Sequence, residues 1–336
     1  MTEFRQDAIV GRWVLVRVSD IWPPDRYHAG QAPRGAAISP FIYGREDMTP
    51  PEVDAIRPKD TRPDTPGWTV RTVPNKFPAL RIEGGLDPRG VGIYDMYNGV
   101  GAHEVVIETP DPRKQMADFS VAEVADVIKM YQNRYSSLAK DRRFRYIAIF
   151  KNYGESAGAS LEHAHSQIIA LPILPKYFEE KLQGADRYFS FRGRSIYADI
   201  LRKEYTDRER IVTENEDFVA FCPYTPRYAF EVSIFPKDTS SNFGGLSDKQ
   251  RLSLGEILKE VLVRLKQCLN DPSLNYYFNI NPVNSEPQEN FLWHIDIIPQ
   301  LFRSAEMEWG TELYVVNTPP DAAARFLREI SYTAQV

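Results

Sequence analysis

The chain has 336 residues, a net charge of −5 and 43 % hydrophobic residues, a composition typical of a globular protein with one large domain or two smaller ones. Its lysines and arginines are scattered, which argues against a nucleic-acid-binding face, and no apolar run reaches the roughly 18 residues that a membrane helix needs. The polar first ten residues do not resemble a signal peptide, and two cysteines do not make a disulfide scaffold, so we expect a cytoplasmic protein.

Proline is frequent before residue 80, which predicts a long irregular segment with short strands. The chain then reads strand, strand, helix, strand, strand, with a strand and loop at 68–80 and strands at 104–108, 145–150 and 166–171. Ser120 opens the helix with Glu123 as its capping box. The apolar face of this helix consists of Val124, Val127, Ile128, Tyr131 and Tyr135.

The same order returns in the second part of the chain. Strands are expected at 217–222, 230–235, 276–280 and 293–298, with a helix that starts at 246–248. Any α+β protein can show such an alternation of strands and helices. A repeat is nevertheless favoured by the sequence similarity between VIETPDPRKQMADFSVAEV and SIFPKDTSSNFGGLSDKQ. We therefore predict an α+β fold with two similar halves, 1–190 and 191–336, built from mainly antiparallel sheets with helices packed on them.

The sharpest motif is HAHSQ, an H-x-H-x-Q string that begins at His163. Alternate side chains of a strand share a face, so His163, His165 and Gln167 are expected to project together. A Gly-rich turn at 154–160 precedes the string, and its backbone N–H groups can approach a phosphate because Gly158 and its neighbours add little bulk. A neutral imidazole beside fixed donors is suited to nucleophilic attack on phosphorus. An isolated H-x-H is weaker evidence, since such histidines can also be metal ligands or buried polar residues.

This segment resembles the active-site strand of the histidine-triad superfamily, in its galactose-1-phosphate uridylyltransferase branch, where H-P-H-G-Q or a similar string stands. The flanking sequences, FKNYGESAGAS and ALPILP, are more similar still to those of the plant ADP-glucose phosphorylases of the same branch. The likeness covers nearly the whole chain. GRWVLV at 11–16 resembles the family's opening strand, PNKFPAL at 74–80 its N-x-F-x-A-L turn, and AFE and PK within 229–237 its P-F-E…P-K segment.

The resemblance implies a duplicated histidine-triad fold and a double displacement, in which His165 becomes nucleotidylated, a sugar 1-phosphate leaves and a second phosphate takes the nucleotide. Gln167 can donate a hydrogen bond but not a proton, and hydrolases of the superfamily place a histidine there, so Gln167 favours transfer over hydrolysis. The predicted catalytic residues are His165, Gln167 and His163. Predicted substrate contacts are Asn75, Asn152, Gly158, Ser160 and Glu312, the last because GTE at 310–312 resembles the family's sugar-binding G-Y-E.

Several positions depart from the family pattern. In the second half we expect Asp296 to stand where a nucleophile would, so this half is predicted to be degenerate, with structural and substrate-binding roles. The resemblance implies four zinc ligands, but three of these positions hold Ser39, Ile42 and Pro112, and His163 alone cannot hold zinc. A second H-x-H metal site of some relatives is also incomplete here. We therefore predict no metal and no cofactor, with the loop around Ile42 held by packing.

The family resemblance also implies two arginines that bind phosphate in uridylyltransferases. In this chain their positions hold Asp20 and Pro23. Arg17 or Arg26 could substitute for them. Arginine forks suit a diphosphate well, so their loss bears on substrate identity more than on reaction type.

We conclude from the sequence that the chain is a nucleotidyltransferase similar to hexose-1-phosphate uridylyltransferases, acting between a nucleotide sugar and a phosphate or sugar 1-phosphate. Two alternatives stay open: an ADP-sugar phosphorylase or adenylyltransferase that uses phosphate as acceptor, and an inactive nucleotide-binding protein. We expect poor uridylyl exchange between UDP-glucose and galactose 1-phosphate, and better turnover of ADP-glucose with phosphate. A homodimer is implied by the resemblance, and no nucleic-acid or membrane partner is expected.

Overall fold

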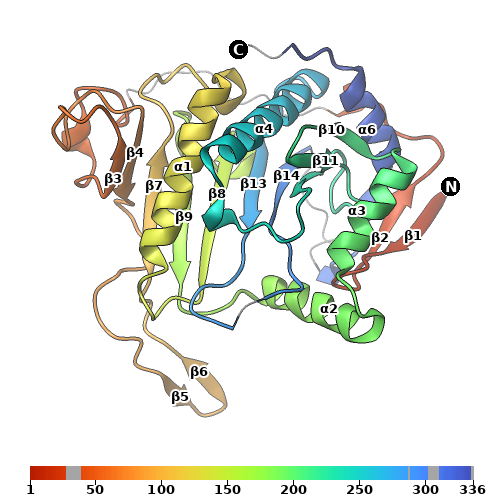
Figure 1. Ribbon diagram of the computed structural model, residues 1–336, viewed down its shortest axis with the longest axis horizontal. Coiled ribbons are helices and arrows are strands. Elements are labelled where there is room, and N and C mark those ends of the chain that lie inside the picture. Colours follow the sequence, from red (N-terminus) through yellow and green to blue (C-terminus); the bar gives the residue numbers. More distant parts are fainter. Residues whose placement is uncertain (28–38, 287, 302–309, 334–336) are drawn as a thin grey trace.

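The computed structural model of the protein describes residues 1–27, 39–286, 288–301 and 310–333, and one long sheet runs through it (Figure 1). Ten strands follow the order β10-β11-β12-β14-β13-β8-β9-β7-β4-β3, and every neighbouring pair is antiparallel. The first half supplies β3 (Asp54–Ile56), β4 (Val70–Pro74), β7 (Ala102–Ile107), β8 (Tyr146–Tyr153) and β9 (His165–Leu171). The second half supplies β10 (Ile211–Glu214), β11 (Phe218–Phe221), β12 (Val232–Pro236), β13 (Leu274–Asn279) and β14 (His294–Pro299).

The strand order makes the duplication visible. Reading outward from the central β8–β13 pair, the first half gives β8, β9, β7, β4 and β3, and the second gives β13, β14, β12, β11 and β10. Each half therefore repeats one unit, and the two units share a single sheet. This confirms the predicted duplicated α+β fold. The proposed boundary between residues 190 and 191 falls near the end of a helix and stays a prediction.

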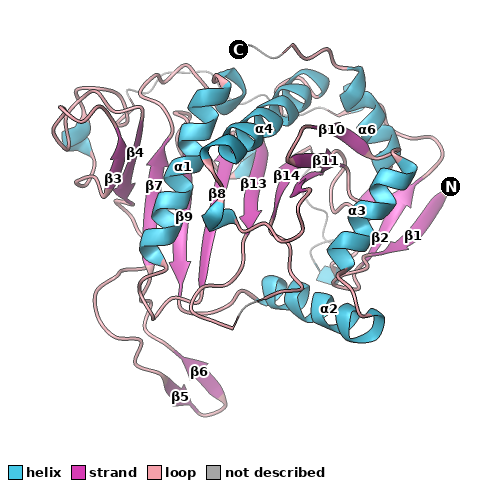
Figure 2. Ribbon diagram, viewed as in Figure 1, coloured by secondary structure: helices cyan, strands magenta, loops and turns pink. Residues whose placement is uncertain are grey.

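Two long helices, α1 (Val121–Leu138) and α4 (Asp248–Cys268), cover one face of the sheet (Figure 2). Each begins at a serine, Ser120 or Ser247, whose side chain accepts a hydrogen bond from the backbone three residues on, as the sequence predicted for the first. The helices cross closely because Gly255 has no side chain; a Cβ there would lie 3.0 Å from the Val121 carbonyl oxygen. The main hydrophobic core packs these helices against the sheet and continues to helices on its other face. The helix α6 (Pro320–Glu329) packs beside α4.

The opposite face of the sheet is covered in its second half. Helices α2 (Lys176–Arg192) and α3 (Ile196–Asp207) lie over it, and so does a small sheet of β1 (Thr2–Gln6), β2 (Trp13–Arg17) and β15 (Tyr314–Val316). The rings of α2 and α3 contact residues that project from this face: Phe178 packs on Tyr146, and Tyr197 packs on Phe235 and His294. None of the helices in the described part of the chain is long and apolar enough to cross a membrane.

In the first half, no helix among the described residues covers the face of the sheet opposite α1 and α4, and we call this part the open face. It carries a smaller apolar cluster. It consists of Phe41, Trp68, Val73, Val105 and Ile107. The cluster holds the proline-rich N-terminal segment against β4 and β7, where Trp68 also donates its indole N–H to Glu46 over 3.0 Å. Short 3-10 helices occur in the irregular segments, at Pro24–Arg26, Glu46–Met48, Met116–Asp118, Glu155–Ala157 and Phe243–Gly245.

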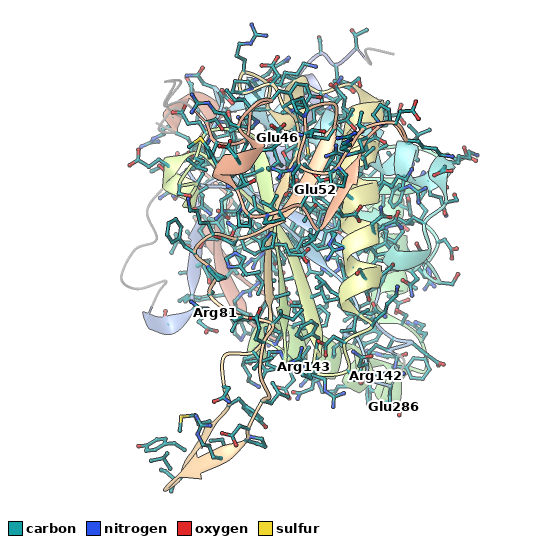
Figure 3. The ribbon with its side chains drawn as sticks, turned by 90° about the vertical axis from the view of Figure 1, so that its left-hand side faces the viewer. Glu46, Glu52, Arg81, Arg142, Arg143 and Glu286 are labelled. Atoms are coloured by element: carbon teal, nitrogen blue, oxygen red, sulfur yellow. The ribbon has the colours of Figure 1, made fainter. Side chains whose placement is uncertain are left out.

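A two-stranded arm projects from the first half. It is formed by β5 (Arg89–Val91) and β6 (Tyr94–Met96), and it stands clear of the rest of the molecule in two views at right angles (Figures 1 and 3). At its base, Arg143 donates a hydrogen bond to the Gly84 carbonyl over 2.6 Å. The arm carries exposed apolar side chains, which include Val91, Ile93, Tyr94, Met96 and Tyr97.

Candidate active site

His165 opens β9 in the middle of the first half's strands. Its neighbours across the sheet are Ile107 on β7 and, by continuing the antiparallel register from Phe150 and Gln167, Asn152 on β8. Its side chain belongs to the face that α1 and α4 do not cover, because the next residue, Ser166, faces α1 and accepts a hydrogen bond from Tyr131 over 2.7 Å. His165 is 7 % exposed.

A backbone carbonyl fixes the tautomer of His165. The ring Nδ1 lies 2.7 Å from the carbonyl oxygen of His163. A carbonyl oxygen can only accept, so Nδ1 carries the hydrogen and Nε2 keeps the lone pair. Burial lowers the pKa of His165, and the positive charge of Lys151 lowers it further. The imidazole is therefore neutral near pH 7, and Nε2 is a competent nucleophile.

Lys151 supports the start of β9 from the covered face of the sheet. Its ammonium donates to the His165 carbonyl over 3.0 Å and pairs with Glu108, and both side chains are buried. A buried ion pair of this kind holds the strand entry in one geometry and sets the charge beneath the imidazole. The sequence analysis did not identify this pair.

His163 lies before the strand and not on it, because β9 begins at His165. Its Nε2 donates to the Thr109 carbonyl over 2.7 Å, and its buried Nδ1 has no hydrogen-bond partner among the described residues. The ring of Phe41 contacts both imidazoles edge-on, with centroids 5.7 Å from each. The predicted shared face is thus retained through packing, although the regular strand does not extend to His163.

The residues around His163 do not fit a zinc site. Ser39, Ile42 and Pro112 hold the other positions that the family resemblance assigns to zinc, and only Nδ1 of His163 offers an imidazole donor. No group of three or more possible metal-binding residues occurs in the described part of the chain. Phe41 fills the space with an apolar ring, and we assign no chemical step to a metal.

Gln167 is held by a histidine that the motif did not reveal. The backbone N–H of Ala79 donates to Nδ1 of His103 over 3.1 Å, so the hydrogen of this imidazole sits on Nε2. That nitrogen donates to Oε1 of Gln167 over 2.7 Å. Nδ2 of Asn75 lies 3.0 Å from the same nitrogen but makes no hydrogen bond with it in this tautomer, because both groups are donors. Since Oε1 accepts from His103, the amide –NH₂ of Gln167 is free to donate to a ligand beside His165.

Asn152 is oriented by a chain of amides. Asn275 on β13 donates to Oδ1 of Asn152 over 2.8 Å, which leaves the Asn152 –NH₂ as a donor on the open face. The α-carbon of Gly158 lies beside it, since a Cβ there would come within 3.7 Å of Asn152 Nδ2. Asn75, Asn152, Gly158, His165 and Gln167 thus lie on one face of the first half.

The Gly-rich turn does not offer its amides as freely as the sequence suggested. The N–H groups of Ala157 and Ala159 donate to the Gly154 carbonyl, and that of Gly158 donates to Glu155. These three donors close the turn itself, because a left-handed Gly154 and Gly158 fold it back. Side-chain amides, not these backbone groups, are the donors on this face. Ser160 lies at the exposed end of the turn.

Other predicted phosphate or sugar contacts lie elsewhere in the chain. Glu312 is exposed directly before β15, whose Tyr314 packs on Tyr228 of the second half. Arg17 donates to Asn317 over 3.2 Å, and Arg26 stacks on Trp22. The structure therefore does not bring these three side chains to His165 within one chain.

The second half keeps a histidine at the nucleophile's position. His294 opens β14 as His165 opens β9, and its Nδ1 lies 2.8 Å from the carbonyl two residues earlier, the same hydrogen bond that His165 makes. Asp296 therefore corresponds to Gln167, and the expectation that Asp296 replaces the nucleophile was wrong. Assigning the strand register needed this hydrogen bond, which the sequence does not show.

Comparisons with known proteins agree with this arrangement. Residues 51–175 match the family model of the galactose-1-phosphate uridyl transferase N-terminal domain, and residues 176–312 match that of its C-terminal domain. An ADP-glucose phosphorylase of Arabidopsis thaliana is 33 % identical over 98 % of this chain and 93 % of its own length. A galactose-1-phosphate uridylyltransferase of Thermotoga maritima is 29 % identical over 98 % of both chains.

Solved structures show the same fold. An Arabidopsis ADP-glucose phosphorylase with bound ADP-glucose superposes with a TM-score of 0.83 at 31 % identity, covering 99 % of this chain and all of that one. A uridylyltransferase superposes with a TM-score of 0.75 at 26 % identity, covering 98 % of this chain and 97 % of that one.

Proposed function

The chain belongs to the galactose-1-phosphate uridylyltransferase family and is a nucleotidyltransferase that acts on nucleotide sugars with phosphate or a sugar 1-phosphate, and we propose that His165 carries the nucleotide between the two half-reactions. The observation that supports this most is the tautomer of His165. Its Nδ1–H is committed to the His163 carbonyl over 2.7 Å, so its free lone pair is on Nε2.

In the first half-reaction, Nε2 attacks the α-phosphorus of the nucleotide sugar. The P–N bond forms as the bond from this phosphorus to the bridging oxygen breaks, and the electron pair leaves with the sugar 1-phosphate. The imidazole gains positive charge, which the His163 carbonyl stabilises through the Nδ1–H. The leaving phosphate needs no strong acid, so the amide donors of Gln167 and Asn152 suffice to stabilise the phosphoryl oxygens.

In the second half-reaction, an oxygen of phosphate or of a sugar 1-phosphate attacks the same phosphorus. The P–N bond breaks, its electron pair returns to Nε2, and the neutral imidazole is restored. With phosphate as acceptor the product is a nucleoside diphosphate, and with a sugar 1-phosphate it is a new nucleotide sugar. No proton has to be supplied to a leaving group in either step, which is consistent with Gln167 in place of an acid.

A labelling experiment tests the assignment of His165. Incubation with a nucleotide sugar radiolabelled in its α-phosphate should give an acid-labile, base-stable protein adduct, absent in His165→Ala. The variant should also lose turnover by about a thousandfold or more. The matched control is Ser166→Ala, the next residue on the same strand, which faces the covered side and should keep the adduct. Label retained in His165→Ala would refute the role.

For the substrate pair, ADP-glucose with phosphate is our proposal. It is supported by the sequence that flanks the histidine motif and by Asp20 and Pro23 in place of the paired arginines. The 33 % identity with a protein named ADP-glucose phosphorylase supports it as well. The test compares kcat/KM for ADP-glucose phosphorolysis with kcat/KM for uridylyl exchange between UDP-glucose and galactose 1-phosphate. A higher kcat/KM for uridylyl exchange than for phosphorolysis would contradict this proposal and would favour the galactose-1-phosphate uridylyltransferase activity of the family.

Three further properties are proposals of the same kind: a cytoplasmic location, a homodimer, and a His165 site that works without metal. The donor set at His163 supports the last of these, since one imidazole cannot hold zinc. Elemental analysis of protein purified without chelator should give far less than one zinc per chain. A stoichiometric, tightly bound metal would contradict this proposal.

A further inference from the structure

A cavity of about 600 Å³ lies over the second half, on the face of the sheet that carries His294 and Asp296. Helices α2 and α3 form its walls, with Tyr177 and Ile200 among the lining residues, and the N-terminal loop at Ile9 closes one side. Its volume is in the range of small-molecule sites. By the duplication, its floor corresponds to the floor of the candidate active site, so one half presents a nucleophile and the other a partly enclosed cavity.

His294 cannot act in this cavity as His165 acts in the first half. The ammonium of Lys181 lies 3.0 Å from Nε2 of His294, and also 2.7 Å from Oδ1 of Asn279 and 3.4 Å from Oδ2 of Asp296. Since Nδ1 of His294 donates to the Leu292 carbonyl, Nε2 holds the lone pair, and the lysine occupies it. The second half therefore offers binding and not nucleophilic chemistry.

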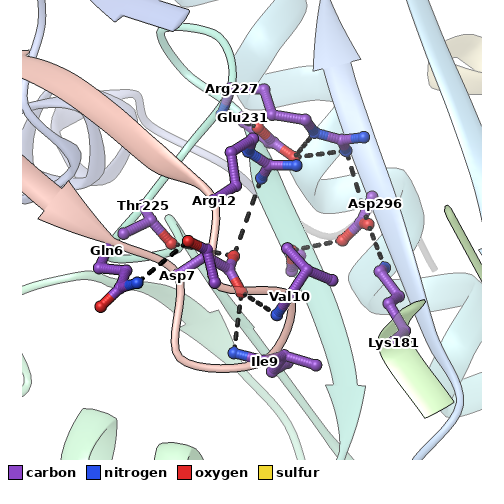
Figure 4. A network of polar contacts seen from close by, with 12 residues as sticks. Gln6, Asp7, Ile9, Val10, Arg12, Lys181, Thr225, Arg227, Glu231 and Asp296 are labelled. Carbon is purple, nitrogen blue, oxygen red and sulfur yellow. Dashed lines mark hydrogen bonds and ion pairs between the residues drawn. The ribbon is translucent and has the colours of Figure 1, made fainter. Parts of the chain in front are cut away.

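Most charges on the cavity wall are already neutralised (Figure 4). Arg227 forms an ion pair with Glu231 over 2.7 Å and lies 3.7 Å from Asp296, which Lys181 also neutralises. The other ionised residues of the lining, apart from Arg12 and Asp7, also form ion pairs: Asp199, Lys203, Glu204, Asp207 and Arg210. A ligand that binds here by charge must therefore use a different residue.

Among the described residues that line the cavity, Arg12 is the cation with the longest contact to a carboxylate. Its side chain is 12 % exposed, and its Nε has no hydrogen-bond partner among the described residues. Its ion pair with Oδ2 of Asp7 is long, at 3.8 Å, and its remaining partners are the Tyr177 hydroxyl and the rings of Tyr177 and Tyr314. Asp7 is itself satisfied, because it accepts from the backbone of Ile9 and Val10 and from Thr225.

A largely buried guanidinium with an unpartnered Nε–H and only a long ion pair is stabilised by a further acceptor. We propose that the cavity is a second ligand site, in which Arg12 binds the oxyanion of a small metabolite, a phosphate or carboxylate group on a body of sugar size. The rings of Tyr177, Tyr188 and Tyr224 line the cavity and offer apolar surface to such a body. The site is separate from His165 and does not depend on the proposed transfer reaction.

Isothermal titration calorimetry tests the proposal on the full chain with four probes: inorganic phosphate, glucose 6-phosphate, gluconate and glucose. We expect at least one oxyanion to bind, in wild type and in His165→Ala alike. Arg12→Met should weaken this binding by about tenfold or more, since it removes a charged hydrogen bond. Phosphate-only binding identifies a phosphate site, and gluconate binding a carboxylate site.

Two variants separate loss of the site from loss of the fold. Ile200→Trp fills the cavity from α3 without touching Arg12 and should also abolish binding. Arg325→Met removes an exposed arginine outside the cavity and should leave binding unchanged. Binding that survives both Arg12→Met and Ile200→Trp, equal affinity for glucose and its phosphate, or no binding of any probe would overturn the proposal.

Discussion

Gln167 depends on a side chain from a different strand for its orientation. His103 donates to its Oε1 over 2.7 Å, and a backbone amide fixes the tautomer of that imidazole. Removing the ring leaves the Gln167 amide free to rotate, so its –NH₂ is no longer fixed toward the phosphoryl oxygens. We predict that His103→Ala lowers kcat by about 10- to 100-fold, because small misplacements of a catalytic donor cost this much.

The effect of His103→Ala should appear in the rate of adduct formation on His165, with KM for the nucleotide sugar little changed. Ser166→Ala is the control, since its hydroxyl bonds Tyr131 on the covered face. A variant whose KM rises while its kcat stays constant would show that His103 contributes to ground-state binding and not to positioning Gln167.

The sequence could predict the residues that carry chemistry but not those that orient them. His165 and Gln167 lie two positions apart, so the period of a strand places them on one face. His103 lies on another strand far away in the chain, and its role follows from the pairing of β7 with β9. The same limit explains the error at Asp296, because strand register depends on backbone hydrogen bonds that no spacing encodes.

At the scale of elements, the β5–β6 arm is the feature that needs a partner. An isolated two-stranded hairpin is marginally stable in water, and this one exposes Ile93 by 90 % and Tyr94 by 70 %. We predict that the arm contacts a second copy of the chain, and that Ile93→Asp with Tyr94→Asp shifts the protein from dimer to monomer in sedimentation velocity.

The control for the arm is Phe191→Asp, which places one aspartate at an apolar position that is 80 % exposed on α2. It should leave the oligomeric state unchanged. The melting temperature of the arm variant should also change little beyond the loss of association, since the arm makes few contacts with its own core. A wild-type chain that sediments as a monomer would remove the basis for the prediction.

Elements with regular apolar spacing were predicted well, and elements placed by tertiary contact were not. The strands that were predicted and the two long helices agree with the structure within a few residues, because burial on one face imposes a period on the sequence, whereas β3 and β10 were not predicted. No prediction was made for α2. Its Gly184 is buried against the N-terminal loop, where a Cβ would lie 1.9 Å from the Ile9 carbonyl oxygen, so a contact with a distant segment decides that residue.

For the whole molecule, three buried histidines tie stability to pH. The pKa values of His163 and His165 are lowered by burial, and burial together with Lys181 lowers the pKa of His294 to about 3. The unfolded chain protonates these rings near their ordinary value of 6.5, while the folded chain does not. The unfolded state then binds more protons, so stability is fully present above about pH 6.5 and falls as the pH drops below it.

Urea unfolding between pH 7.5 and 4.5 measures this dependence. We predict a steady loss of unfolding free energy over the interval, and a shallower loss in His294→Gln, which removes the ring whose pKa is lowered to about 3. Both proteins are compared by their change with pH, so a general destabilisation of the variant does not matter. Equal slopes would show that His294 does not govern the dependence.

The shared sheet has a consequence for how the chain is made. On one side β8 pairs with β9 from its own half, and on the other side it pairs with β13 from the second half. β13 is synthesised more than a hundred residues after β8. At ordinary rates of synthesis this delay is on the order of ten seconds, during which β8 is an open sheet edge in a nascent chain. An open edge can pair with another polypeptide, so we expect the first half expressed alone to be captured by chaperones or to aggregate. The closure of β8 by β13 would then be the step that commits the newborn chain to its native form.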